Sequence, residues 1–195
     1  YSAEEIASMG PGTDWQDVIF RTARIQSHTI NFSGGSDATR YSFSTNFFEQ
    51  EGLIIETGAK RGSMRLNLDH EVNKLVTVGF NMMLSRREVQ RLNVNNGNLG
   101  GRIYTDAMAM PPTLNGPYDA QGQLYQIEAM PEYAYVSLDV RNPLYHARRK
   151  DRTLTNSVLT NAFVELNLAK GLKFRSMFAL EYGNNINEVF VPIIY

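Results

Sequence analysis

The sequence predicts an all-β fold, an antiparallel meander of about six long strands. Two observations predict it. Apolar and polar residues alternate with a period of two over most of the chain, and turn residues separate the alternating runs. The runs often reach about ten residues, which is longer than the five or six usual in soluble proteins. The strands are expected to begin near residues 25, 39, 60, 75, 153 and 171.

Composition narrows the class of protein. The 195 residues carry a net charge of -1, so there is no electrostatic reason to expect nucleic acid as a partner. Cysteine is absent, which excludes disulfides, thiolate metal sites and a cysteine nucleophile. No run of about 18 apolar residues occurs, which argues against a membrane-spanning helix. Membrane-spanning strands stay possible, because their faces alternate and never give such a run.

Residues 1–23 predict loop and short helices instead of a strand. Ser2 with Glu5 has the form of a capping box. After a Gly-Pro-Gly break, Thr13 or Asp14 is placed to cap a second short helix that runs to about residue 22. One side of this helix would carry Trp15, Val18 and Ile19.

Residues 24–88 are predicted to hold the first four strands. Turn residues at 33–37 join the first strand to the second, and Asn73-Lys74 joins the third to the fourth. The last run shows the alternation most clearly, with Val76, Val78, Phe80, Met82 and Leu84 opposed by Thr77, Gly79, Asn81 and Ser85.

Residues 89–152 interrupt the pattern and predict one long connection. A polar stretch, 93–101, leads into a predicted helix from Ile103 to Met110, which Pro111-Pro112 ends. Connections of this length are usually functional or disordered. Alternation resumes in residues 153–195, where two further strands are expected.

The apolar sides of these strands fit either a soluble sandwich or a membrane barrel wall. The lengths of the connections favour the wall. Short turns at Gly34, Asn73 and Lys170 all fall at one end of a meander, and the longer connections fall at the other. Outer-membrane barrels show this asymmetry, with short periplasmic turns and long extracellular loops. A soluble lectin-like β-sandwich that binds glycan through its long loop is the alternative.

Several segments resemble one family. Residues 13–54 (TDWQDVIFRTARIQSHTINFSGGSDATRYSFSTNFFEQEGLI) and residues 60–86 (KRGSMRLNLDHEVNKLVTVGFNMMLSR) are similar to SusC/RagA-type TonB-linked outer-membrane transporters. The Met110-Pro111-Pro112-Thr113 element and residues 171–183 (GLKFRSMFALEYG) also resemble this family, in the family's order. The similarity runs through nearly the whole chain.

The resemblance implies a barrel of about 22 strands around a plug, with a long, partly helical extracellular loop. It implies a place in the bacterial outer membrane, import of glycans or peptides, energy from the TonB complex, and a SusD-like surface lipoprotein as partner. It also implies that the chain starts in the extracellular loop after the first barrel strand and lacks the plug, the TonB-contacting segment and the closing strands. No cofactor is expected, and the identity of the imported substrate does not follow.

Two sets of loop residues are candidates for contacts. Tyrosine offers a flat apolar ring and a hydroxyl to a substrate or a lid protein, although such residues also pack loops internally. The tyrosines are Tyr104, Tyr118, Tyr125, Tyr133 and Tyr135. Arginine suits the phosphates of lipopolysaccharide, although a charge run is commonly just solvated. These basic residues are Arg148, Arg149, Lys150 and Arg152, with Arg141 nearby. Lipid or the aromatic girdle at the membrane interface is the expected environment of Phe43, Phe47, Phe174, Phe178 and Tyr182.

No pattern predicts an enzyme. The stretch from His70 to Lys74 lacks the second histidine that a zinc-binding helix needs. Gly34-Gly35-Ser36 is not followed by the lysine of a phosphate loop, and no Gly-x-Ser-x-Gly element occurs. Glu49 and Glu51 are expected to be solvated loop charges.

Overall fold

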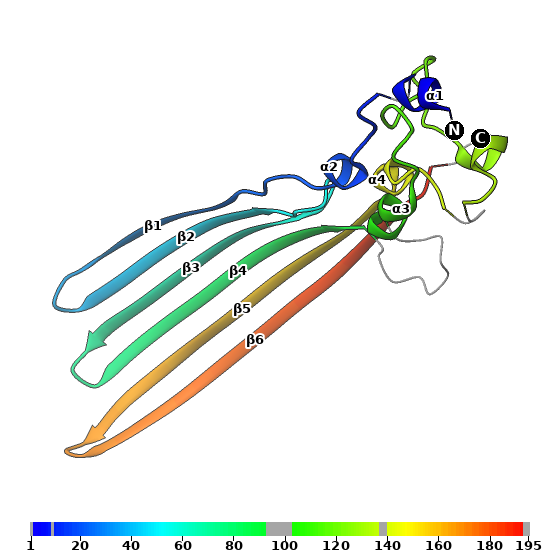
Figure 1. Cartoon of the computed structure of the whole chain (residues 1–195). Helices are drawn as coiled ribbons and strands as arrows, with labels where there is room; N and C mark the ends of the chain where they lie inside the picture. Colours follow the sequence, from blue (N-terminus) through cyan, green and yellow to red (C-terminus); the bar gives the residue numbers. More distant parts are fainter. Residues whose placement is uncertain (1, 9, 93–102, 137–139, 193–195) are drawn as a thin grey trace.

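The computed structural model describes residues 2–8, 10–92, 103–136 and 140–192. They form one six-stranded antiparallel sheet in which each strand pairs with the next one along the chain (Figure 1). The strands are β1 (Ile25–Gly35), β2 (Thr39–Glu51), β3 (Gly58–Asn73), β4 (Val76–Arg91), β5 (Lys150–Ala169) and β6 (Leu172–Phe190). The predicted meander of six strands is confirmed.

All of the helices lie at one end of the sheet, and the three hairpin turns lie at the other (Figure 1). The helices are α1 (Ala3–Ser8), α2 (Trp15–Ile19), α3 (Ile103–Ala109), α4 (Leu144–Arg148) and the 3-10 turns η1 (Ile127–Ala129) and η2 (Pro131–Tyr133). The predicted sorting of short and long connections is therefore confirmed. Among the described residues, no helix is long and apolar enough to cross a membrane.

The tight turns follow from local chemistry. The Asn73 side chain accepts hydrogen bonds from the backbone N–H groups of Leu75 and Val76, at 2.9 and 3.0 Å, which closes the β3–β4 turn. Gly171 in the β5–β6 turn has a φ of 82°, a left-handed conformation that glycine adopts at little cost. Both hairpins keep their register because their turns are specified in this way.

Strand register places most of the large apolar side chains on one face, called here the apolar face. A single row of paired residues runs across Tyr41, Leu68, Phe80, Ala162 and Phe178. On β4 this face carries apolar residues from Val76 to Leu84. At about 3.3 Å per residue, that stretch is roughly 26 Å long, measured along the strand. A tilted strand of about 9–11 residues crosses the hydrocarbon core of a membrane.

Nothing in the described part of the chain forms a second layer over the apolar face. Phe43, Leu66 and Phe80 are only half-buried, within the sheet itself. Phe32 and Phe178 keep 56% and 68% of their surface exposed. Soluble proteins rarely leave such a large continuous apolar area open. The two-layer sandwich considered as the alternative does not describe this fold.

A small hydrophobic core sits at the helical end. We call this part the loop module and define it as residues 13–21, 53–57, 103–136 and 140–149. Its core, together with Leu92 at the end of β4, is a cluster of buried residues: Trp15, Ile19, Leu92, Ile103, Ala107, Met110, Leu114, Ile127 and Val140. Segments nearly a hundred positions apart are joined here, because the Trp15 indole Nε1 donates a 2.9 Å hydrogen bond to the Pro111 carbonyl.

Within the loop module, backbone hydrogen bonds join residues 13–21 to the β2–β3 connection. The Arg21 N–H donates to the Leu53 carbonyl at 2.8 Å, and the Ile55 N–H donates to the Ile19 carbonyl at 3.0 Å. Ile54 and Ile55 also pack against the core. Three stretches that are separate in sequence therefore form one structural unit.

Two predicted elements have different bounds in the structure. The helix expected from Trp15 to about residue 22 ends at Ile19, because Phe20 is extended and forms a bridge with Ile54. Asp14 caps this helix as predicted, accepting from the backbone of Gln16 and Asp17. The helix expected from Ile103 to Met110 is present as α3 and ends one residue earlier, at Ala109.

Candidate functional surfaces

The face opposite the apolar face, called here the polar face, carries a hydrogen-bonded network. Asn81 Nδ2 donates to Asn161 Oδ1 at 2.8 Å, joining β4 to β5. Asn67 Nδ2 donates to Ser42 Oγ at 2.8 Å, joining β3 to β2. Amides and hydroxyls satisfy one another across strands in this way when a face is wet or covered by polar protein.

Near the hairpin end, the polar face holds an aromatic ring beneath a cation. The Phe163 ring lies over Gly79, where an added Cβ would come within 2.0 Å of it. The Arg175 guanidinium lies 3.7 Å from the centroid of that ring. Lys173 pairs with Glu165 at 2.9 Å beside it. Gly79 is thus required by the close approach of the ring.

At the loop end, the side of the sheet that bears the apolar face becomes charged. Acidic and basic side chains alternate across five strands and form ion pairs, and we call this group the charged belt. Lys60 pairs with Glu49 at 2.8 Å, while Arg152 pairs with Glu88 at 3.3 Å and with Glu188 at 2.7 Å. The belt lies beyond the apolar residues of the same face, as expected at the boundary between hydrocarbon and water.

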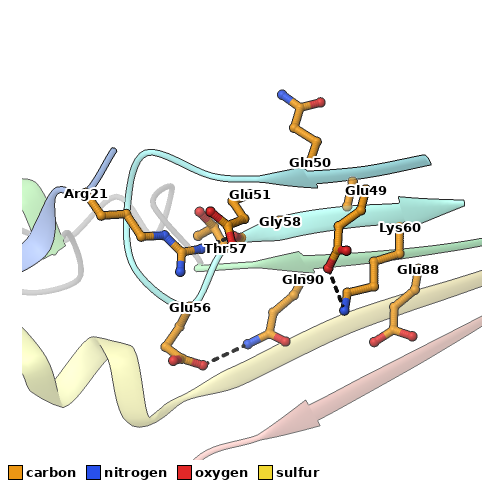
Figure 2. A pocket seen from close by; sticks show the side chains of 11 residues that line it. Arg21, Glu49, Gln50, Glu51, Glu56, Thr57, Gly58, Lys60, Glu88 and Gln90 are labelled. Atoms are coloured by element: carbon orange, nitrogen blue, oxygen red, sulfur yellow. Dashed lines mark hydrogen bonds and ion pairs between the residues drawn. The ribbon is translucent and has the colours of Figure 1, made fainter. Parts of the chain in front are cut away.

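A groove adjoins the charged belt at the β2–β3 connection. In Figure 2, Glu49, Lys60 and Glu88 project to the same side of the sheet. Gln90 donates to Glu56 at 3.4 Å across this groove. Its lining comprises Arg21, Glu49, Gln50, Glu51, Glu56, Thr57, Gly58, Ala59, Lys60, Glu88 and Gln90.

Hydrogen bonds favour the ionised form of two carboxylates in the groove. The hydrogen bond from Lys60 is the main cause that lowers the pKa of Glu49 below its ordinary value. The backbone N–H of Arg24 does the same to the pKa of Glu51. Lys60 is paired with Glu49, and the Arg21 side chain donates to the backbone carbonyls of Gly52 and Thr57, so the groove has the character of a solvated polar network. No acid or base for catalysis is singled out.

The five tyrosines divide into two groups. Tyr104, Tyr125 and Tyr133 pack against the core of the loop module, and Tyr133 also shares a 3.0 Å hydrogen bond with Thr113. Tyr118 and Tyr135 are 47% and 73% exposed. Of the five, these last two have exposed rings.

The basic residues also divide. Arg152 is held by two carboxylates of the charged belt. Arg149 is half-buried, whereas Arg148 and Lys150 are exposed. Within the described residues, neither Arg148 nor Lys150 makes an ion pair, so both are available to a phosphate.

Sequence reasoning missed a buried hydrogen-bonded pair of side chains in the loop module. Asp106 on α3 is fully buried and its Oδ2 lies 2.7 Å from Nε2 of His146 on α4. Asn142, also fully buried, donates to the Pro117 carbonyl at 2.7 Å. A lone Asp on a helix and a distant His carry no spacing signal, so only the three-dimensional fold brings them together.

Sequence comparison finds curated relatives. The chain is 30% identical over 188 residues to TonB-dependent receptor P3 of Formosa agariphila. It is 26% identical over 176 residues to TonB-dependent receptor P26 of the same organism. These matches cover 94% and 90% of this chain but only 18% and 16% of the relatives. The chain therefore spans less than a fifth of their length. No family model matches it.

Structure comparison agrees with the sequence matches. The RagAB peptide importer in its closed-closed state matches 92% of this chain with a TM-score of 0.70 and 25% identity. A second structure, of the RagAB peptide transporter, matches 91% with a TM-score of 0.71 and 26% identity. Each match covers 20% of the solved chain.

Proposed function

The chain is a homologue of one segment of the SusC/RagA-type TonB-dependent transporters, and on that premise we propose that it forms part of the wall of an outer-membrane β-barrel transporter. The observation that carries this proposal is the two-sided sheet. One face is apolar over roughly 26 Å, as hydrocarbon requires. The other is a polar network suited to water or to polar protein.

The positions of the connections support an orientation. The three hairpin turns are short and share one end, and the loop module occupies the other (Figure 1). Periplasmic turns of outer-membrane barrels are short and extracellular loops are long. The loop module is therefore on the cell exterior, where a substrate arrives first.

Partners and cargo are carried over from the relatives. A transport role, with peptides or glycans as cargo and TonB as the energy source, fits the names of the curated relatives and of the RagAB importer. A SusD-like surface lipoprotein would cover the loop module. Tyr118 and Tyr135 are the residues we assign to contact with substrate or lid, since their rings are exposed.

We assign two basic residues, Arg148 and Lys150, to contacts with the outer leaflet of the membrane. Lys150 lies on the strand face that continues the apolar side, paired with Phe190, and Arg148 ends the helix just before it. Both cations are exposed near the charged belt, at the level where lipopolysaccharide phosphates lie. Arginine binds phosphate through its planar fork and lysine as a point charge.

Cysteine labelling in the full-length transporter tests the wall directly. This chain holds no cysteine, so Leu66→Cys and Asn67→Cys each introduce a single thiol into it. In liposomes, a water-soluble maleimide should label Cys at 67 through the lumen and spare Cys at 66, which hydrocarbon covers. Equal labelling at the two positions would contradict the proposal.

A further inference from the structure

Two arginines stand directly opposite each other on the polar face near the loop end. Arg61 on β3 and Arg87 on β4 are paired residues in the strand register. Like charges at such positions repel and destabilise a sheet. Both side chains are exposed, and neither makes an ion pair with any described residue. An anion bound between them would remove this repulsion, and the paired positions of the sheet supply none.

The surroundings of this pair leave room for a ligand. The next row toward the hairpin end consists of the paired residues Ser63, Ser85 and Ser157. Arg65 stands one row further on, about 13 Å along the strand from Arg61. Short hydroxyl side chains therefore lie between the arginine pair and Arg65 on the same face of the sheet.

An aromatic ring positions one of the guanidinium groups. Arg61 lies over the Phe48 ring, 5.6 Å from its centroid. Such stacking orients the planar fork while leaving its N–H edge free for an acceptor. Phe48 belongs to the same row as the arginine pair and flanks it on the β2 side.

Charged residues at the loop end have oppositely charged partners on the apolar side of the sheet, whereas Arg61 and Arg87 on the polar face have none among the described residues. On the apolar side, Lys60 and Arg152 each have carboxylate partners in the charged belt. On the polar face, the acidic residues lie in other rows: Asp69, Glu71, Asp151, Glu165 and Glu181. Arg86, next to Arg87 but on the opposite face, is paired with Gly62 and Asn156 and faces no like charge. The repulsion is confined to Arg61 and Arg87.

We propose that Arg61 and Arg87, with the serine row and Arg65, bind an oxyanion of the imported substrate, so that the cargo is a carboxylate-bearing oligomer. Guanidinium forks and hydroxyls are donors that match a carboxylate. The site lies at the end of the sheet that bears the loop module, which is the entry side. Since this face is a lumen surface only in the barrel, the site rests on the proposed function.

Arginine footprinting of the full-length transporter in detergent tests this site. Phenylglyoxal modification of Arg61 and Arg87 is measured by mass spectrometry, with Arg86 as the control on the other face and pentaglutamate as the probe. We expect both arginines to react in the free protein, to be protected by pentaglutamate and not by pentaglutamine, and Arg86 to be indifferent to either peptide.

Two results would overturn the site. Failure of pentaglutamate to protect the pair shows that no oxyanion of a ligand binds there. Arginines that are unreactive before any probe is added show that an acidic side chain of the same protein already occupies them. The wall proposal fails separately, through equal labelling of Leu66→Cys and Asn67→Cys, whatever the arginines do.

A matched pair of variants separates binding from structure. The double substitution Arg61→Gln with Arg87→Gln should weaken binding of pentaglutamate by about tenfold or more, because two charge-assisted contacts are lost. Arg86→Gln should leave it unchanged. The double variant should melt no lower than the parent protein without the probe, since it relieves a repulsion. A lower melting temperature would show a structural role and contradict the site.

Discussion

The sheet and the loop module bury their apolar residues in different ways. Nearly every buried apolar side chain of the described residues belongs to the loop module or adjoins it, whereas the strands leave Phe32, Phe174 and Phe178 exposed. The loop module is stabilised by a hydrophobic core of its own. The sheet has no core of its own. None of the described residues covers its apolar face, and we propose that lipid covers it. Substitutions should therefore destabilise the two regions for different physical reasons.

Removing the central ring of the loop module should have the largest effect. Trp15→Ala leaves a cavity among buried residues and removes the hydrogen bond to Pro111, at a cost of about 3–5 kcal/mol. Limited proteolysis of the full-length protein should then cut the loop module rapidly while the strands resist. Tyr135→Ala, which removes an exposed ring, is the control and should change the cleavage rate little. Equal effects would show that the module has no independent core.

A charge on the apolar face should have the next largest effect. Leu66→Arg places a guanidinium in hydrocarbon, at a cost of about 2–4 kcal/mol near the bilayer centre. Asn67→Arg, on the polar face, should cost much less. Denaturant unfolding of the protein refolded into liposomes measures both. If the two variants are equally stable, the sheet does not separate lipid from an aqueous lumen.

Breaking the buried hydrogen bond between Asp106 and His146 should have a smaller effect, confined to the loop module. His146→Ala leaves the fully buried Asp106 side chain without its side-chain partner, at a cost of about 1.5–3 kcal/mol. Hydrogen exchange of α3 and α4 should rise while that of β3 and β4 stays unchanged. His28→Ala, at an exposed strand position, serves as the control. Unchanged exchange in α3 would mean that the pair does not stabilise the module.

The charged belt should contribute least. Arg152→Gln removes two ion pairs that are partly open to solvent, and exposed pairs contribute about 0–1 kcal/mol each. The loss in melting temperature should be small at low salt and vanish at high salt, because salt screens such pairs. A large, salt-independent loss would indicate that the belt is buried against something other than water.

The same contrast explains how much the sequence could predict. Within the apolar band, one face is dry and the other wet, so the alternation along Val76 to Leu84 identified β4 at once. Beyond it, β4 continues to Arg91 and β5 begins at Lys150. There both faces of the strands are polar, so apolar and polar residues no longer alternate, although the hydrogen bonds between the strands continue. The sequence pattern therefore ended where the apolar band ends.

The loop module could be predicted only in parts. The Asp14 cap and the helix from Ile103 have local signals and were found. The contact between Trp15 and Pro111 and the pair of Asp106 with His146 join residues that no periodicity links. Five tyrosines looked alike in the sequence, and only packing separates the exposed Tyr118 and Tyr135 from the rest.

The most direct measurement of the central claim is a quenching scan along β4 in the full-length protein. Single cysteines at positions 76 to 85 carry a fluorescent label, and brominated lipids quench labels that touch hydrocarbon. Gly79 is left out, because a side chain there would meet the Phe163 ring. We predict strong quenching at Val76, Val78, Phe80, Met82 and Leu84 and weak quenching at Thr77, Asn81, Met83 and Ser85. Quenching without this alternation, or with the opposite phase, would contradict the assignment of the apolar face to lipid.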